Sequence, residues 1–485
     1  MRKILLFLTL LGIIALAGGA VLAPVAGAQA LDAGELVSVF PEYPGDQAEV
    51  SRGEYAALLV KAANMPLDGY QVPLPGDVAA DVWYAPYINT LYREGILRGY
   101  PDGTLRPEAP VSRLEAVVLV SRVLGLPDGA AAAGQVPGLE DSNWAYVPYS
   151  WLFTWGLVAP DADPAGEMLV GEAVKFLAQV FGSDPEAEAI IEKAQQVQKE
   201  TGGVSFTGDM AMTMRPRAGI PDWPEQLKAL QMHARVTTEV LLPATLHQAM
   251  QMELNLPPEI LGPEVPAIPP MDFEQYLVDG VMYQKVTDPT TGEARWMRLP
   301  EQATPDMEAL MEAVQKNEFY QQAIPEELRP YLHYRLLGTT ELDGRQVYKV
   351  VSYGRIDDFT AFMKAALPEN MQEMVLDPQV AEGMGSMNDL IRTMTYWGTS
   401  YVGVDDYLTY GEEFRAVIGF GEKFMGEAFP FEIMEMHMQA GDYRYGDNIV
   451  IELPPEALKA EELPIPEATQ QGALPPTEGE PTKTE

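Results

Sequence analysis

The sequence predicts a multidomain protein in which an all-α helical repeat array precedes an α+β domain built on an antiparallel sheet. Three observations lead to this prediction. A capped helix start at Ser112–Glu115 recurs upstream at Ser51–Glu54, which marks an internal repeat. From Gly202 onward the hydrophobic period changes from helical to twofold. Two Pro-rich stretches, 256–270 and 453–485, punctuate the second part.

The first thirty residues have the pattern of a secretory signal peptide. A basic start precedes an apolar core from Ile4 to about Ala17, and Ala28-Gln29-Ala30 offers a small-x-small cleavage site. The chain has no Cys, so we expect neither a lipid anchor nor a disulfide. No later stretch reaches the run of about eighteen apolar residues that a membrane helix needs. We therefore expect a secreted mature chain that does not span a membrane.

The composition limits the kinds of partner. The 485 residues contain 32 Lys plus Arg against 71 Asp plus Glu, a formal net charge of −39. Nucleic acids and anionic membranes reward cations, so this balance disfavours both as partners. The excess charge keeps an exported protein soluble; binding of divalent ions by an acidic surface is the alternative. A chain this long exceeds one hydrophobic core, so two or three domains are expected.

The composition shifts divide the chain into five segments. A charged helix bridges the repeat and the twofold-periodic region, and the final stretch has too few aromatic residues to order itself. The predicted segments are a signal peptide at 1–30, the repeat array at 31–182, a linker helix at 183–201, the β-rich domain at 202–455 and a disordered acidic Pro-rich tail at 456–485.

The middle unit of the repeat is complete. It holds Asp77, a helix begun by Trp83, a Gly-rich turn at 99–103 and a helix start at 112–115. In that start, the Ser side chain and a Glu three residues later form a capping box ahead of an apolar run.

The other two units are degenerate. The first has only the later half of the pattern, and its helix begins at Arg52. The third contains Trp144, but Val170 stands where Arg52 and Arg113 stand in the other two units. A different sequence at 160–163 replaces the Gly-rich turn.

These repeat residues resemble the S-layer homology family. Units of that family combine an Asp-Val element, a Trp-containing helix, a Gly-Tyr-x-Asp-Gly turn and a Thr-Arg-Ala-Glu helix start. The resemblance covers 35–182. It implies that helical units pack with pseudo-threefold symmetry and bind cell-wall polysaccharide, often pyruvylated, without a covalent bond.

The resemblance also implies where the polysaccharide binds, because in that family the Arg, the Trp and the glycine turn line each groove. An Arg at a helix N-terminus suits a carboxylate independently of any family, since its planar fork adds to the positive end of the dipole. The predicted polysaccharide-binding residues are Arg52, Arg113, Trp83, Asp77, Gly99, Tyr100, Asp102, Gly103 and Trp144.

The predicted binding residues could instead have purely structural roles. Without the resemblance, Arg113 would be a surface arginine that pairs with Glu115 or Glu108. Trp83 and Trp144 would be core residues. Since the third unit lacks the Arg, at most the two grooves that hold Arg52 and Arg113 are expected to bind.

The β-rich region is built from runs that alternate apolar and polar residues. Its methionines alternate too, which suits either an adaptable apolar cavity or ordinary core filling. Helical interruptions are expected near 305–327 and 357–370. The predicted strand runs are 227–241, 245–255, 273–287, 294–299, 331–342, 345–353, 390–404, 406–420 and 430–445.

Residues 273–283, followed by Trp296-Met297-Arg298-Leu299-Pro300, resemble a pattern in LolA/LppX-like secreted lipoproteins, a family that includes members of unknown function. The resemblance spans roughly 190–455. It implies a curved half-barrel sheet with helices against its concave face. Proteins of that shape carry lipids or acyl chains, or sense envelope components, without catalysis.

No catalytic or metal-binding motif is found. The four histidines show no metal-ligand spacing, and there is no Gly-x-Ser-x-Gly elbow or phosphate-binding loop. The acidic pairs at 357–358 and 405–406 are expected to cap a helix and a hairpin. The sequence therefore predicts no enzyme, no cofactor and no metal.

Two functional hypotheses follow. The first is a non-enzymatic cell-surface protein anchored to wall polysaccharide, whose second domain binds a lipid or another hydrophobic envelope ligand. The second is a structural S-layer or envelope protein whose second domain makes only protein–protein contacts. A polysaccharide hydrolase remains a third and weaker option, because glycosidase carboxylates need not be close in sequence.

Overall fold

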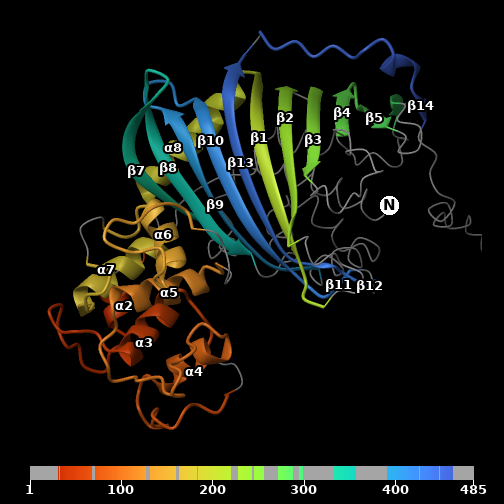
Figure 1. The fold of residues 1–485 in the computed structure, drawn as a ribbon. Coiled ribbons are helices and arrows are strands. Elements are labelled where there is room, and N and C mark those ends of the chain that lie inside the picture. Colours follow the sequence, from red (N-terminus) through yellow and green to blue (C-terminus); the bar gives the residue numbers. More distant parts are fainter. Residues whose placement is uncertain are drawn as a thin grey trace, which may run out of the picture.

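The computed structural model gives the fold for most of the chain after the expected signal peptide (Figure 1). The structure describes residues 31, 33–67, 71–126, 132–159, 163–182, 184–219, 228–242, 245–255, 271–287, 294–298, 332–356, 390–424, 427–446 and 448–462. The predicted signal peptide, the helices near 305–327 and 357–370, the loop at 256–270 and most of the tail lie outside these residues.

A twelve-stranded sheet dominates the second part, with strand order β14-β6-β5-β4-β3-β2-β1-β13-β10-β9-β8-β7. Its neighbours pair antiparallel except β14 and β6, which are parallel. A separate pair is formed by β11 (Lys423–Phe424) and β12 (Glu427–Ala428). The strands of the large sheet are β1 (Gly203–Pro216), β2 (Leu230–Leu241), β3 (Thr245–Asn255), β4 (Met271–Val278), β5 (Val281–Thr287), β6 (Ala294–Arg298), β7 (His333–Leu342), β8 (Arg345–Ile356), β9 (Ile391–Gly403), β10 (Thr409–Phe420), β13 (Phe431–Tyr445) and β14 (Glu461–Glu462).

Methionines form a buried ladder on one face of this sheet. Successive residues of a strand point to opposite faces, so the alternating methionines of β1 and β13 meet across the ladder. Met210 faces Met438, and Met212 faces Met436. Tyr334 lies in the same cross-strand row as Met210, by way of β8, β9, β10 and β13.

The same face is covered at its β7 end by α8 (Pro185–Glu200). Ile190 and Ile191 of this helix pack with Tyr334 and Val350. The helix begins at Asp184, whose carboxylate accepts the backbone N–H of Ala187. The sequence predicts Ser183 as the cap of this helix, but the cap is Asp184, and Ser183 itself lies outside the described residues.

Six helices of the first part gather beside β7–β9 (Figure 1). Both predicted capping boxes are confirmed: Ser51 with Glu54, and Ser112 with Glu115. These boxes satisfy N–H groups that a helix start otherwise leaves without partners. The helices are α2 (Ala33–Val37), α3 (Arg52–Ala62), α4 (Ala85–Arg93), α5 (Arg113–Val123), α6 (Tyr146–Thr154) and α7 (Val170–Phe181).

The predicted fold class is wrong. The first part is not an all-helical array, because antiparallel β-bridges join the segments that precede α3, α5 and α7. These bridges pair Ser51 with Pro110, Ser112 with Glu167, and Glu49 with Leu169. They depend on partners 55 to 120 positions away in the sequence, which helical periodicity cannot detect.

The helices and the sheet share apolar packing. One continuous apolar cluster contains residues of α3–α7 together with Val351, Tyr353, Trp397 and Val417 of the sheet. The last four lie on the face opposite the methionine ladder, because they alternate with its residues along their strands. Among the described helices, none is long and apolar enough to cross a membrane.

Candidate functional site

The candidate site is built where the starts of α3, α5 and α7 meet the loops of neighbouring repeat units. At each start, the first two backbone N–H groups donate to carbonyls of the loop that precedes the next of these helices. Such N–H groups have no partner inside the helix, so the loop replaces water. The donor–acceptor pairs are Arg52 to Ala109, Gly53 to Pro107, Arg113 to Gly166, Leu114 to Pro164, Val170 to Ala48 and Gly171 to Asp46, all at 2.8–3.0 Å.

The side chains follow the same order. Arg52, the first residue of α3, pairs with Glu115, the third residue of α5. Arg113, the first residue of α5, pairs with Glu172, the third residue of α7. The expectation that Arg113 would pair with Glu115 or Glu108 is therefore wrong. In α7 the first residue is Val170, so the third start has no arginine at this place.

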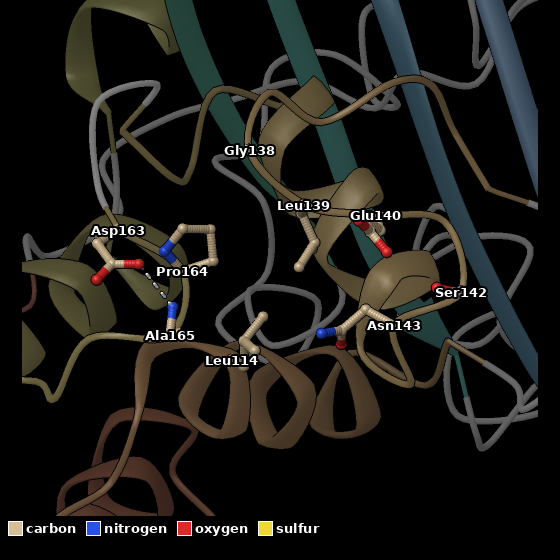
Figure 2. Close-up of a pocket in the computed structure, with 9 residues that line it drawn as sticks. All are labelled: Leu114, Gly138, Leu139, Glu140, Ser142, Asn143, Asp163, Pro164 and Ala165. Carbon is tan, nitrogen blue, oxygen red and sulfur yellow. Dashed lines mark hydrogen bonds between the residues drawn. The ribbon is translucent and has the colours of Figure 1, made fainter.

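The groove between the start of α5 and the loop that precedes α7 contains a pocket of about 280 Å³. Figure 2 shows Leu114 below it, Asp163 and Pro164 on one side, and the loop with Asn143 on the other. The full lining is Leu114, Gly138, Leu139, Glu140, Ser142, Asn143, Asp163, Pro164 and Ala165.

Arg113 lies at the same groove and is held by three acceptors. Its Nη2 lies 2.7 Å from Oε2 of Glu172, its Nε donates to Oε1 of the same carboxylate, and its Nη1 donates to the carbonyl of Asp163 at 3.3 Å. The hydrogen bond to Glu172 raises the pKa of the guanidinium. A Cβ at Gly166 would collide with Nη1 of Arg113, so a larger residue there would displace this end of the guanidinium. The Arg113 side chain keeps 21% of its surface exposed.

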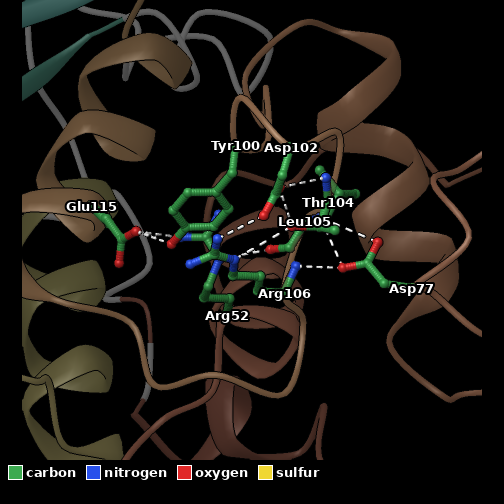
Figure 3. Close-up of polar contacts among 8 residues, drawn as sticks. All are labelled: Arg52, Asp77, Tyr100, Asp102, Thr104, Leu105, Arg106 and Glu115. Atoms are coloured by element: carbon green, nitrogen blue, oxygen red, sulfur yellow. Dashed lines mark hydrogen bonds and ion pairs between the residues drawn. The ribbon is translucent and has the colours of Figure 1, made fainter.

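The groove between α3 and α5 is more enclosed (Figure 3). Arg52 keeps only 7% of its side chain exposed. Its Nε donates to the carbonyl of Leu105 at 2.8 Å, and its Nη1 lies 2.8 Å from Oε1 of Glu115. The ring of Tyr100 lies between two guanidiniums, 4.9 Å from Arg52 and 4.0 Å from Arg106. These contacts place Arg52 inside a cation–π and ion-pair network.

The electrostatics of Glu115 reflect this network. Burial alone would raise the pKa of its carboxyl, but the Tyr100 hydroxyl at 2.6 Å and the Arg52 guanidinium outweigh burial and lower it. Burial and the hydrogen bond to Glu115 raise the pKa of Tyr100. The first groove is therefore held by an ionised carboxylate and a protonated phenol.

The predicted turn at 99–103 is a rigid part of this groove. Gly99 and Gly103 have φ of 74° and 81°, and a Cβ at Gly99 would lie 2.8 Å from the carbonyl of Thr104. Asp102 accepts from Thr104 and pairs with Arg106 at 2.8 Å, and these bonds lower the pKa of Asp102. Asp77 does not reach Arg52. It accepts the backbone N–H groups of Leu105 and Arg106.

The two predicted tryptophans lie in different environments. Trp83 is half-buried among aromatic rings, with ring centroids 5.7 Å from Phe40, 5.5 Å from Tyr84 and 6.3 Å from Tyr87. Trp144 is 63% exposed and follows Asn143 of the pocket lining. Trp83 is therefore not grouped with Arg52, whereas Trp144 is exposed and adjoins the pocket lining in the sequence through Asn143.

Tyr84 accounts for the difference between the two grooves. Its ring packs directly on Gly53, where a Cβ would lie 2.8 Å from ring carbons. Gly53 is the second residue of α3, as Leu114 is of α5, and Tyr84 precedes α4 as Ala145 precedes α6. Thus a Gly–Tyr contact fills the first groove, while Leu114 and Ala145 at the corresponding positions leave the second groove open.

Sequence reasoning missed Glu172, Arg106 and Tyr84. The capping pattern marked Glu115 but did not indicate its partner. The available signal for Glu172 was its position, because it is the third residue of α7 as Glu115 is the third residue of α5. In the part of the chain that the structure describes, no group of three His, Asp or Glu side chains could hold a metal ion.

Comparison with known proteins agrees with the repeat pattern. Residues 76–117 match the model of the S-layer homology domain. A stretch of 98 residues is 45% identical to Cell surface glycoprotein 1 of Acetivibrio thermocellus, covering 18% of this chain and 4% of that protein. A stretch of 70 residues is 39% identical to the outer membrane protein SlpA of Deinococcus radiodurans, covering 14% of this chain and 6% of that protein. The chain thus spans only a small part of the length of these relatives.

The sheet region is similar to LprF of Mycobacterium bovis, a solved structure. The match has 13% sequence identity, a TM-score of 0.27, and covers 56% of this chain and 98% of that one.

Proposed function

We propose that this secreted, surface-associated protein, which carries an S-layer homology domain, is held non-covalently to cell-wall polysaccharide through the groove between α5 and α7. The observation that carries the proposal is the pocket of about 280 Å³ at the start of α5, whose lining residues Leu114 and Asn143 directly follow Arg113 and precede the exposed Trp144 in the sequence. Small sites with a few polar groups and an apolar face suit one or two sugar rings.

The chemistry of the groove favours sugar hydroxyls. Glu140, Asp163, Ser142 and Asn143 line the pocket, and hydroxyls donate to such carboxylates and amides. Trp144 gives a sugar ring a flat apolar surface. An anionic substituent such as a pyruvyl ketal would compete with Asp163 for Nη1 of Arg113. In this proposal, Arg113, Trp144 and the pocket contact the carbohydrate.

The first groove has a different role in this proposal. Arg52 is 7% exposed and bonded to Glu115 and Leu105, so it holds the repeat units together. Tyr100, Asp102, Gly99 and Gly103 then fix the turn, and Asp77 fixes its end. A sugar would reach only the rim of this groove, at Arg106.

A sedimentation assay with purified cell walls of the source organism tests the proposal. We expect Trp144→Ala and Arg113→Ala to reduce retention of the full chain several-fold, and Arg52→Ala to act mainly through lower stability. Arg98→Ala removes an exposed arginine from the same module and serves as the control. Equal retention of wild type and Arg113→Ala/Trp144→Ala contradicts the proposal, as does equal binding to walls stripped of polysaccharide.

For the sheet, we propose binding of a lipid or another hydrophobic envelope ligand against the methionine ladder. The supporting observation is a buried apolar face made largely of thioethers, which adapt their shape more readily than branched side chains. Mass spectrometry of lipid extracted from the protein purified from its own envelope tests this role, and an extract without lipid contradicts it. Ordered self-assembly of a lipid-free protein in solution would instead favour the structural S-layer alternative.

A further inference from the structure

We propose that Arg335, Arg355 and Thr395 of the sheet are positioning residues for the groove between α5 and α7. They bond the far ends of the two helices whose starts form that groove. The inference rests on the proposed function, because it concerns the same groove, and it adds that the sheet sets the wall affinity of the helical module.

The C-terminal end of α5 is bound by two side chains of the sheet. The hydroxyl of Thr395 in β9 donates to the carbonyl of Gly125 at 2.7 Å, and it also lies 3.2 Å from the carbonyl oxygen of Leu124. Arg355 of β8 donates to the carbonyl of Val123 at 3.3 Å. The last carbonyls of a helix have no partner within it and carry partial negative charge, so a guanidinium and a hydroxyl stabilise this end.

Gly125 makes this close approach possible. Its φ is 76°, and a Cβ there would lie 2.7 Å from both Cδ of Arg355 and Oγ1 of Thr395. Gly156 after α6 has the same arrangement, since its Cβ would lie 2.7 Å from Leu337 of β7. The sheet therefore contacts the backbone itself at the ends of both helices.

The C-terminal end of α7 is bound in the same way. Arg335 of β7 is 7% exposed, and its Nη2 donates to the carbonyls of Gln179 and Gly182, the latter at 2.9 Å. The hydroxyl of Tyr353 donates to the carbonyl of Val180 at 2.8 Å. One guanidinium thus binds two carbonyls at the negative end of the helix dipole.

The helices α4 and α3 differ. A Cβ at Gly95, the glycine after α4, would meet nothing within 4 Å. In the described part of the chain, the hydrogen bonds of Ala63 and Asn64 after α3 stay within that helix. Among the described residues, the sheet therefore donates hydrogen bonds to the C-terminal ends of the helix of Arg113 and the helix of Glu172, and none to the end of the helix of Arg52.

The helices α5 and α7 thus connect the sheet to the groove, because each contacts the sheet at its C-terminal end and the groove at its N-terminal end. The 11 residues of α5 span about 16 Å, so a tilt of about 5° at the sheet end would move the Arg113 end by about 1.4 Å. Such a shift would break the bidentate ion pair between Arg113 and Glu172 and change the width of the pocket. Trp155, the residue that ends α6, stacks on Tyr353 with ring centroids 5.3 Å apart and planes 10° apart, so the helix that packs beside α5 is also held against the sheet.

Wall binding of the full chain tests the inference with Arg335→Met and Thr395→Val. We expect each to weaken wall affinity about fivefold, since each removes hydrogen bonds whose loss typically changes an equilibrium by a factor of 2 to 12. Arg335→Lys keeps a cation at the carbonyls and should restore most of the affinity. In an Arg113→Ala background, Arg335→Met should have no further effect on wall affinity, although its effect on the melting temperature remains.

Hydrogen exchange without any ligand provides the second measurement. Arg335→Met and Thr395→Val should speed exchange in the first turns of α7 and α5, and leave the first turn of α3 unchanged. The inference is overturned if Arg335→Met weakens binding equally with and without Arg113, or if exchange at α3 rises as much as at α5. Failure of the wild type to bind walls would reject the proposed function alone, because the exchange data would still decide the positioning role.

Discussion

The carboxylate of Glu172 bonds Arg113 across the boundary between two repeat units, with Oε2 at 2.7 Å from Nη2. The same relation links Glu115 to Arg52 at 2.8 Å, one unit earlier. Each pair joins the first residue of one helix to the third residue of the next helix in the series α3, α5 and α7. The third relation is missing because Val170 replaces the arginine.

We predict that Glu115→Ala destabilises the protein more than Glu172→Ala. Arg52 and Glu115 are 7% and 19% exposed, against 21% and 32% for Arg113 and Glu172. Removing one partner of a buried pair leaves an uncompensated charge, at a cost of about 3 kcal/mol, whereas exposed pairs contribute up to about 1 kcal/mol. Urea unfolding of the two variants measures the difference. A salt-sensitive loss in Glu115→Ala and a salt-insensitive loss in Glu172→Ala would contradict the assignment.

We predict that Gly125→Ala is far more destabilising than Gly95→Ala. Both glycines follow a helix with positive φ, 76° and 69°, so both alanines meet the same backbone penalty of about 1 kcal/mol. Only the Gly125 methyl group would collide with Arg355 and Thr395. We expect an additional loss of about 2 kcal/mol from this overpacking. Thermal unfolding measures the stability of both variants. Equal losses of stability would contradict the prediction, because they would mean that Arg355 and Thr395 move aside without an energetic penalty.

We predict that Glu412→Gln stabilises the protein above pH 7. Burial raises the pKa of this carboxyl from 4.5 to about 7, despite hydrogen bonds from Tyr443 and Ser400. The folded state then binds a proton that the unfolded state releases between pH 4.5 and 7, so stability falls as pH rises through this window. The shift corresponds to about 3 kcal/mol at pH 8. Urea unfolding at pH 4 and pH 8 should show a gain for the variant only at pH 8.

We predict the opposite pH dependence for His333. Burial, and then the charge of Arg335, lower the pKa of its imidazole from 6.5 to about 4. The unfolded state binds the proton first, so this stability is present above pH 6.5 and is lost as pH falls toward 4. The variant His333→Phe keeps the stacking on Tyr353, at 5.3 Å between ring centroids. Its unfolding midpoint should fall less than that of the wild type between pH 7 and pH 4.

The sequence allowed the local elements to be predicted but not their contacts. Ser112 with Glu115, and the methionine alternation around Met212, are local patterns and appear in the structure as expected. The pairing of Arg113 with Glu172 joins residues 59 positions apart, and nothing near Arg113 distinguishes it from a pairing with Glu115. The all-helical array was wrong for the same reason, since its β-bridges join distant segments.

The candidate site shows the same limit. Trp83 and Trp144 occupy equivalent positions two residues before their helices, yet one is half-buried and the other is 63% exposed. The difference depends on whether Tyr84 or Ala145 follows and on whether Gly53 or Leu114 faces it. Such pairs are contacts between units, so a motif read along one unit does not indicate which groove is open.

The bridges between the three helix starts have a consequence for biosynthesis. The start of α7 is complete only when the backbone N–H of Gly171 donates to the carbonyl of Asp46. In the sheet, β1 pairs with β13, where Met210 faces Met438. A chain that leaves the cell from its N-terminus therefore cannot finish its first module until more than a third of its length has crossed, nor its sheet until β13 has emerged. Much of the chain must remain unfolded during translocation, which is the state that export through a narrow channel requires.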